Sequence, residues 1–266
     1  MGTRAFAERP DDGAKGRVRA QSFADHFSQA RMFLHSQSNI EQAHLASALV
    51  FELSKVQTVH VREAVVGQLR HVDEALAKRV ADGLGLQSLP PAPPAAQPAR
   101  DVALSPATAI IQRMKHTLKA RCVGILVDDG SSAKSIAAMR KAVQAEGARV
   151  KIVAPKVGGA TLDDGSHLAA DGQLAGTPSA LFDAVVSILA PERGAKLAKE
   201  AAAVDWFRDA FGHLKAIAAC KGSQPILQAA GVEKDAGVVD PSDTDAFLAA
   251  AKTRQWDREP KLRTLA

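Results

Sequence analysis

The sequence predicts an α/β protein built from a small all-helical unit, a proline-rich linker and a doubly wound parallel sheet with helices on both faces. Two observations carry this prediction. Apolar residues recur at helical spacing in the first third of the chain, whereas short continuous apolar runs alternate with helical patterns in the second half. Between them lies "SLPPAPPAAQPARDVALSPA", whose prolines lack backbone donors and favour extended conformations. The expected parts are a tail over 1–22, a helical segment over 23–87, a linker over 88–117 and an α/β domain over 118–266.

Local signals predict four helices in the helical segment. Ser38 stands three residues before Glu41, which is the spacing of a capping box at a helix start. Further helices are expected from Val59 and from Asp73, and the last of them ends in glycines near residue 85. A shorter helix precedes these three, and the side chains expected to pack from it are Phe23, Phe27, Met32 and Phe33.

Beyond the linker, four apolar runs predict buried parallel strands. They are "VGILV", "RVKIVA", "DAVVSILA" and "KAIAA", at residues 123–127, 149–154, 183–190 and 215–219. A helix that stops at Gly147 joins the first two strands, and the stretch 155–182 shows no regular pattern. The run "AKLAKEAAAVDWFRDAFGHL" predicts one helix over 195–214.

Composition and charge exclude several classes of function. The formal net charge is +5, but the basic residues are scattered among acidic ones and no aromatic platform for single-stranded nucleic acid accompanies them. No apolar run reaches the roughly 18 residues of a membrane span, and the first twenty residues show no signal-peptide pattern. We therefore expect a cytoplasmic protein with reduced thiols that binds neither nucleic acid nor a membrane.

Open α/β sheets bind ligands at the carboxyl ends of their strands, so "DDGSS" after the first strand and "CKGS" after the last are candidate sites. Neither has the glycine spacing of a phosphate-binding loop, because Gly130 and Gly222 each stand alone. The simpler interpretation of "DDGSS" is a turn in which Ser131 or Ser132 caps the next helix.

Cys220 is the one candidate catalytic residue. A side chain at a strand-to-helix turn lies above the sheet, where helix amides can stabilise a thiolate or an oxyanion. A free thiol has a pKa of about 8.5, however, and a nucleophilic cysteine needs a base or an acidic partner. No histidine follows Cys220, and His213 precedes the whole strand and should lie at the opposite edge. Two alternatives stay open, a nucleophile and a partly exposed structural cysteine, and the missing base favours the second.

The histidines predict no metal site. No HxxxH or HExxH spacing occurs, so surface or capping roles are expected for them. The eight histidines are His26, His35, His44, His60, His71, His116, His167 and His213.

In its order of parts and in several stretches, the sequence resembles the C-terminal portion of large-subunit catalases. The stretches "FADHFSQARMFLHSQSNIEQAHLASALVFELSKV" and "HVDEALAKRVADGLGL" resemble the family's post-barrel helical segment. The linker, "VGILVDDGSSAKSIAAMRKAVQAEGARVKIVAPKVG", "DGSHLAADGQLAGTPSALFDAVV" and "RQWDREPK" resemble its extra flavodoxin-like domain. The resemblance covers nearly the whole chain from about Phe23 onward.

The resemblance implies a place in hydrogen peroxide detoxification and the oxidative stress response. Catalases hold haem iron through a tyrosinate, and this sequence contains no tyrosine. We therefore expect no haem in this chain, and haem only in a partnered catalase haem-domain chain. The expected role is accessory, stabilising, oligomerising or chaperone-like, with a homo-oligomer or such a haem-domain chain as partner.

The α/β domain also resembles class I glutamine amidotransferases, PfpI-type proteases and DJ-1, whose elbow cysteine corresponds in position to Cys220. That resemblance implies an alternative function, a thiol protein or enzyme acting on peroxide, glyoxals or small amides through Cys220. The chain departs from these proteins because no histidine follows the cysteine and the acidic residues after the first strand, Asp128 and Asp129, stand slightly early. The serines near that position are Ser131, Ser132 and Ser135. A third alternative is a binding module that presents a pocket around Cys220 to a small ligand.

Overall fold

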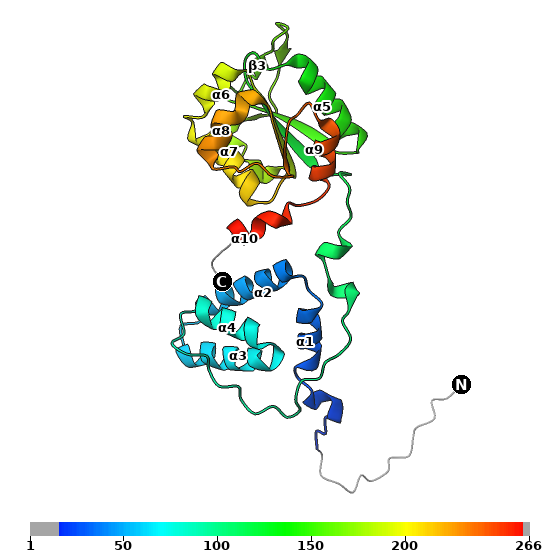
Figure 1. The fold of residues 1–266 in the computed structure, drawn as a ribbon, viewed down its shortest axis with the longest axis vertical. Helices are drawn as coiled ribbons and strands as arrows, with labels where there is room; N and C mark the ends of the chain where they lie inside the picture. The colour runs from blue at the N-terminus through cyan, green and yellow to red at the C-terminus, as the bar shows by residue number, and fades with distance from the viewer. Residues whose placement is uncertain (1–15, 263–266) are drawn as a thin grey trace, which may run out of the picture. The chain divides into compact units, whose positions relative to one another are not determined.

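The computed structural model describes residues 16–262, and the chain divides into two compact units between Ile111 and Gln112. The first is here called the helical unit and the second the sheet unit, which holds every strand of the described residues (Figure 1). No helix within 16–262 is long and apolar enough to cross a lipid bilayer.

The helical unit forms where the local signals predict it. Its helices are α1 (Ser28–His35), α2 (Asn39–Ser54), α3 (Val59–Val72) and α4 (Glu74–Gly83). The capping box at α2 is confirmed, since the Ser38 hydroxyl accepts from the Glu41 N–H and the Glu41 carboxylate accepts from the Ser38 N–H. Asp73 caps α4 by accepting from the Leu76 N–H at 2.8 Å.

The core of the helical unit corrects one expectation about α1. Phe23 is 64% exposed and Phe33 is 41% exposed, so neither packs as the sequence predicts. Leu34 is the α1 side chain that enters the core, because an eight-residue helix turns only one narrow side inward. The buried apolar residues of this core are Leu34, Ala46, Leu53, Val66, Val72, Leu76, Ala77, Val80 and Ala81.

The proline-rich stretch is fixed along the helical unit by hydrogen bonds. We call residues 88–111 the strap. Arg70 donates to the carbonyl of Pro90 at 3.0 Å, and the ring Nε2 of His71 donates to the carbonyl of Pro93 at 2.6 Å. Side chains of residues 28–41 bond five more backbone groups of the strap, which are the N–H groups of Arg100, Ser105, Ile110 and Ile111 and the carbonyl of Thr108. The strap forms no helix or strand over residues 88–105, so side-chain donors of α3 satisfy the carbonyls of Pro90 and Pro93.

The sheet unit contains a six-stranded, all-parallel sheet in the order β5-β2-β1-β6-β7-β8. Its strands are β1 (Cys122–Val127), β2 (Arg149–Ala154), β5 (Gly172–Gln173), β6 (Ala184–Ile188), β7 (Ile217–Ala219) and β8 (Val238–Val239). Its helices are α5 (Ala133–Ala145), α6 (Pro191–Leu197), α7 (Ala201–Gly212), α8 (Gln224–Ala230), α9 (Thr244–Ala251) and α10 (Glu259–Leu262). A separate hairpin pairs β3 (Ala160–Thr161) with β4 (His167–Leu168).

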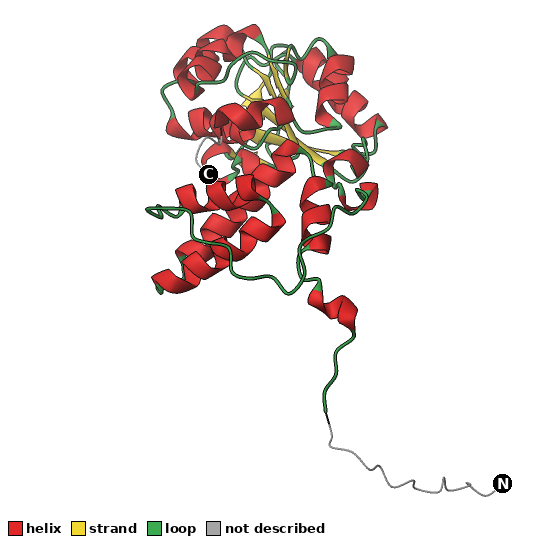
Figure 2. Cartoon of the chain, turned by 60° about the horizontal axis from the view of Figure 1, so that its bottom comes forward, coloured by secondary structure: helices red, strands yellow, loops and turns green. Residues whose placement is uncertain are grey.

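Helices cover both faces of this sheet, as Figures 1 and 2 show. Ile125 of β1 packs in the cluster that contains side chains of α5 and α9, whereas the next residue, Leu126, packs in the cluster of α6, α7 and α8. Successive strand residues point to opposite faces, so a strand buried on both faces is apolar throughout. The predicted doubly wound, flavodoxin-like architecture is confirmed.

Two parts of the sheet unit differ from the sequence prediction. The chain forms α6 and α7 rather than one helix over 195–214, because Glu200 adopts extended angles (φ −97°, ψ 119°) just before α7. This break lets Leu197 of α6 and Trp206 of α7 enter the same core. The prediction also missed β5, β8 and the β3–β4 hairpin, whose two-residue strands are too short to show a periodic pattern.

The end of the described chain is fixed to the sheet unit by Arg258, which is 3% exposed. Its guanidinium donates to both carboxylate oxygens of Asp235, at 2.6 and 2.9 Å, and to the carbonyl of Lys215 at 2.8 Å. The same group lies 4.3 Å from the ring centre of Phe211. Bidentate pairing and ring contact together account for the burial of this arginine.

Candidate functional site

Three neighbouring strands end together at one edge of the sheet. Asp128 follows β1, Leu189 follows β6 and Cys220 follows β7. The chain leaves β1 for β2 on one side and later returns to β6 on the other, so the topological switch point lies between β1 and β6. In folds of this class that is the usual place for a ligand.

Cys220 lies at the end of β7 but not on a strained elbow. Its backbone angles are φ −72° and ψ 170°, which any residue adopts. The Sγ atom lies 3.2 Å from the Leu189 N–H nitrogen, which donates to it, and 3.3 Å from the Leu189 carbonyl oxygen. The Ser223 hydroxyl lies at 3.5 Å and bonds in turn to the buried Ser187 hydroxyl at 2.7 Å. The thiol is therefore part of a small, internally satisfied hydrogen-bond group.

The turn after Cys220 is packed tightly against α6. A Cβ atom added at Gly194 of α6 would lie 1.6 Å from the carbonyl oxygen of Gly222, and one added at Gly222 would lie 2.1 Å from the Leu189 carbonyl oxygen. Both positions need glycine because backbone approaches backbone there. This close contact, and not a phosphate loop, explains the glycine of "CKGS".

No histidine bonds to Cys220 in the described part of the chain. His213 ends α7, before β7 begins, so it lies at the amino end of the strand that Cys220 follows. The hydrogen-bonding groups around the thiol are the backbone of Leu189 and the hydroxyl of Ser223. Neither of these groups is a base that could activate the thiol.

At the end of β1, Asp128 forms a buried ion pair that sequence reasoning missed. Asp128 is 2% exposed, and its carboxylate accepts two hydrogen bonds from Arg193 of α6, each 2.7 Å long. These hydrogen bonds raise the pKa of Arg193. The neighbouring Asp129 pairs with Lys156, and that hydrogen bond together with one from the Thr161 N–H lowers the pKa of Asp129. The paired "DD" was visible in the sequence, but neither cation was, since Arg193 is 65 positions away from Asp128.

A pocket of about 320 Å³ opens beside this ion pair. Its volume is at the lower end of those that hold small ligands. Cys220 is not among its lining residues, which are Asp128, Pro155, Lys156, Gln173, Leu174, Ala175, Arg193, Lys196, Leu197, Glu200 and Ala202. Of its charged groups, Asp128 and Arg193 pair with each other, and Lys156 pairs with Asp129.

The "DDGSS" stretch forms the turn that the sequence predicts. Ser132 caps α5 by accepting from the Ser135 N–H, and Asp163 accepts from the Ala133 N–H at 2.8 Å. Ser131 is fully buried and donates to the Asp128 carbonyl at 2.6 Å. The amino end of α5 is thus occupied by side chains of the protein. Within residues 16–262, no group of three or more histidine, cysteine or acidic side chains could hold a metal ion.

The sheet unit also buries a lysine at the edge away from Cys220. Lys215 is 5% exposed, and its ammonium donates to the Ser179 carbonyl at 2.7 Å. Burial, and secondarily the charge of Arg254, lowers the pKa of Lys215 to about 8. Lys215 lies before β7, so it belongs to the packing of the sheet's amino edge.

Comparison with known proteins gives two family matches and a set of relatives. Residues 119–259, more than half of the chain, match the family described as a C-terminal domain found in long catalases. Residues 20–84 match the family described as catalase-related immune-responsive.

The relatives described here align with most of this chain. Catalase C of Rhizobium meliloti is 44% identical over 95% of the chain and 37% of its own length. Catalase HPII of Pseudomonas aeruginosa is 36% identical over 94% of the chain and 36% of its own length. Catalase-2 of Bacillus subtilis is 32% identical over 93% of the chain and 36% of its own length. The chain therefore spans just over a third of the length of these relatives.

Proposed function

The chain belongs to the family of C-terminal domains found in long catalases, and we propose that it acts as the accessory region of such an enzyme. In this role it stabilises the assembled catalase and adds no haem chemistry of its own. One observation carries the proposal: the chain aligns along nearly all its length with only about a third of each relative. The peroxide chemistry that the relatives' names indicate then belongs to the remaining two thirds.

The residues of this chain support a role without haem. Catalases hold the haem iron through tyrosine, and the sequence contains none. The ring of His35 donates to Asp73 and that of His71 donates to the strap, so both rings are engaged in holding the helical unit together. We therefore propose that this chain supplies no haem ligand.

The internal bonding of both units supports a stabilising role. The strap is held by side-chain hydrogen bonds from α1 to α3, and the carboxyl edge of the sheet is closed by the contact between Gly194 and Gly222. Polar groups that form hydrogen bonds within the protein hold its surface in one conformation. A surface held in this way loses little conformational entropy when it binds a partner.

The test combines this chain with the haem-containing remainder of a long catalase, expressed as a separate polypeptide. We expect a complex on size exclusion and a longer half-life of peroxide-dependent oxygen release on heating. The matched control is Leu34→Asp, which places a charge in the core of the helical unit and should abolish both effects. Absence of a complex together with an unchanged half-life contradicts the proposal.

A second function, thiol chemistry at Cys220, is favoured by one observation. The Leu189 N–H donates to Sγ, and such a donor stabilises the thiolate. In that function, peroxide would oxidise the thiol to a sulfenic acid and release water. We propose measuring iodoacetamide alkylation at neutral pH in the native protein, in Cys220→Ser and in Cys122→Ser. Burial raises the pKa of Cys122, so this thiol is the internal control. Alkylation no faster than that of a free cysteine peptide argues against thiol chemistry.

A further inference from the structure

The first described residues form an exposed extended segment, here called the arm (residues 16–20). Every arm residue is exposed, and Val18 is 94% exposed, the highest value among the large apolar side chains of the described chain. Arg17 and Arg19 flank it and make no hydrogen bond or ion pair with other described residues. An isolated exposed valine is ordinary, but one between two unpaired arginines on an extended backbone has the chemistry of a docking peptide.

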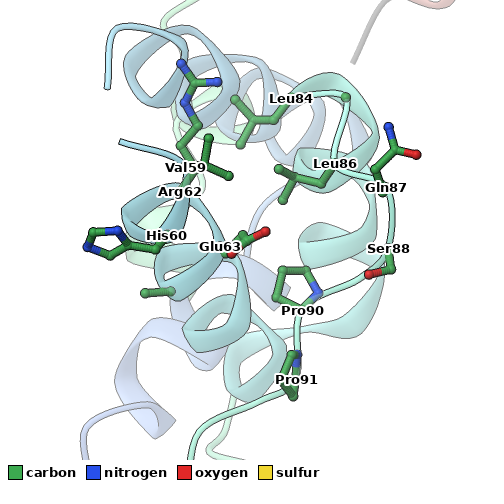
Figure 3. Close-up of a pocket in the computed structure, with 12 residues that line it drawn as sticks. Val59, His60, Arg62, Glu63, Leu84, Leu86, Gln87, Ser88, Pro90 and Pro91 are labelled. Carbon is green, nitrogen blue, oxygen red and sulfur yellow. The ribbon is translucent and has the colours of Figure 1, made fainter. Parts of the chain in front are cut away.

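The helical unit contains a groove that such a peptide fits. It has a volume of about 560 Å³ and lies between the first turns of α3 and the segment 84–91, as Figure 3 shows. Its apolar walls are formed by Val59, Ala64, Leu84, Leu86, Pro90 and Pro91. Val59 is 55% exposed because none of the residues 16–262 covers it fully. The polar part of its lining comprises His60, Arg62, Glu63, Gln87 and Ser88.

Glu63 supplies a negative charge to this groove. Figure 3 shows its carboxylate between α3 and the side of the groove formed by Leu86 and Pro90. No described residue pairs with it. The adjacent Arg62 forms no ion pair with it, because its guanidinium donates to the carbonyls of Val56 and Ser54. The groove thus places an acid without an ion-pair partner beside an apolar wall, and this pair of features complements an apolar residue flanked by arginines.

The start of α3 adds backbone donors at the same place. The side chain of Thr58, the N-cap residue, makes no capping hydrogen bond. The N–H groups of Val59 and His60 have no acceptor within the described residues. First-turn amides need an acceptor, and a carbonyl of an extended peptide laid along the groove provides one.

We propose that the arm of one copy of this chain binds the groove of a second copy, with Val18 against the apolar walls and one of the two arginines paired with Glu63. Apart from the hydrogen bond that the Phe23 N–H donates to the Ala20 carbonyl, the described residues make no hydrogen bond or ion pair with the arm, so the arm of one copy is available to the groove of another. Two identical contacts related by a two-fold axis result, and such a contact closes a dimer. This inference rests on the assembly role proposed above and names the surface that carries it.

The first experiment measures self-association of the full 266-residue chain by sedimentation velocity. We expect a dimer whose dissociation constant rises about tenfold or more in Glu63→Arg and in the pair Arg17→Glu and Arg19→Glu. Combining all three substitutions re-creates the charge pair with opposite signs and should restore the dimer. Glu52→Arg is the control of equal charge change, since Glu52 is exposed on α2 outside the groove. A native chain that is monomeric, or a dimer that none of the groove and arm variants weakens, overturns the proposal.

The second experiment identifies the chains that touch. Val18→Cys in a copy with one affinity tag is mixed with Gln87→Cys in a copy with another tag, since Gln87 lines the groove. A disulfide between the two tags is expected, whereas Val18→Cys with Lys78→Cys, an exposed position on α4, should give none. A disulfide that forms only within one chain overturns the exchange. Neither experiment contains a haem-domain chain. A negative result in them therefore overturns the arm–groove contact only, and the accessory role is still tested by the heat-inactivation experiment.

Discussion

Lys215 should make the stability of the sheet unit rise with pH, and replacing it with methionine should remove that rise. The ammonium group is buried and donates to the Ser179 carbonyl, and burial lowers its pKa from 10.5 to about 8. In the unfolded chain the pKa returns to its ordinary value. Between about pH 8 and 10.5 the unfolded state therefore binds more protons than the folded state, and the free energy of unfolding increases with pH.

The size of this effect follows from the two pKa values. They differ by 10.5 minus about 8, or about 2.5, and each pKa unit corresponds to 1.36 kcal/mol, so the buried charge costs about 3 kcal/mol. That penalty is fully present below pH 8 and is relieved as the pH approaches 10.5. Lys215→Met keeps the length of the side chain and removes the titration.

The assay is urea unfolding at a series of pH values from about 7.5 to 10, followed by tryptophan fluorescence. Both tryptophans, Trp206 and Trp256, belong to the sheet unit, and the chain has no tyrosine to titrate in this range. We expect the unfolding free energy of the native protein, minus that of Lys215→Met, to increase with pH by up to about 3 kcal/mol as the buried charge is lost. The control is Lys199→Met at an exposed position, whose curve should stay parallel to that of the native protein. A Lys215→Met curve that is also parallel refutes the reasoning.

Three further perturbations test the close contacts and the buried pair. Gly194→Val places Cβ 1.6 Å from a backbone carbonyl oxygen and should destabilise the sheet unit by more than about 3 kcal/mol in urea unfolding; an unchanged midpoint would contradict the packing. Gly67→Val places Cβ 2.6 Å from a strap carbonyl oxygen, so faster protease cleavage within 88–111 is expected, with Ala64→Val as the control. Asp128→Asn should lower the free energy of unfolding by about 3 kcal/mol, because Arg193 loses its carboxylate partner. Adding Arg193→Met should recover part of this loss, and a double variant whose loss equals the sum of the two single losses would argue against the ion pair.

Sequence predicted those elements whose signals are local. The capping box of Ser38 and Glu41 and the N-cap at Asp73 each involve residues three positions apart, so no tertiary information is needed to recognise them. The buried strands β1 and β2 were equally clear, because each contains six residues of mostly apolar sequence. The two-residue strands were not, since their backbone conformation is imposed by the neighbouring strand with which they pair.

The candidate site shows the same division. The position of Cys220 at the end of a strand follows from the apolar run before it, and the absence of a later histidine is plain in the sequence. Its bonds to Leu189 could not be predicted, because those residues are 31 positions apart and meet only where β6 and β7 pair. The catalytic assignment of Cys220 stays a prediction that the alkylation experiment tests.

The sequence by itself determined the order of parts, the types of the long elements and the resemblance to catalases, because periodicity and capping depend on residues within about one helical turn. Only the tertiary structure decided that the proline-rich strap is bonded to the helical unit, that Asp128 is paired with Arg193 and that the charge of Lys215 is buried. Each of these depends on which distant segments the fold brings together, and burial then sets the strength of the interaction.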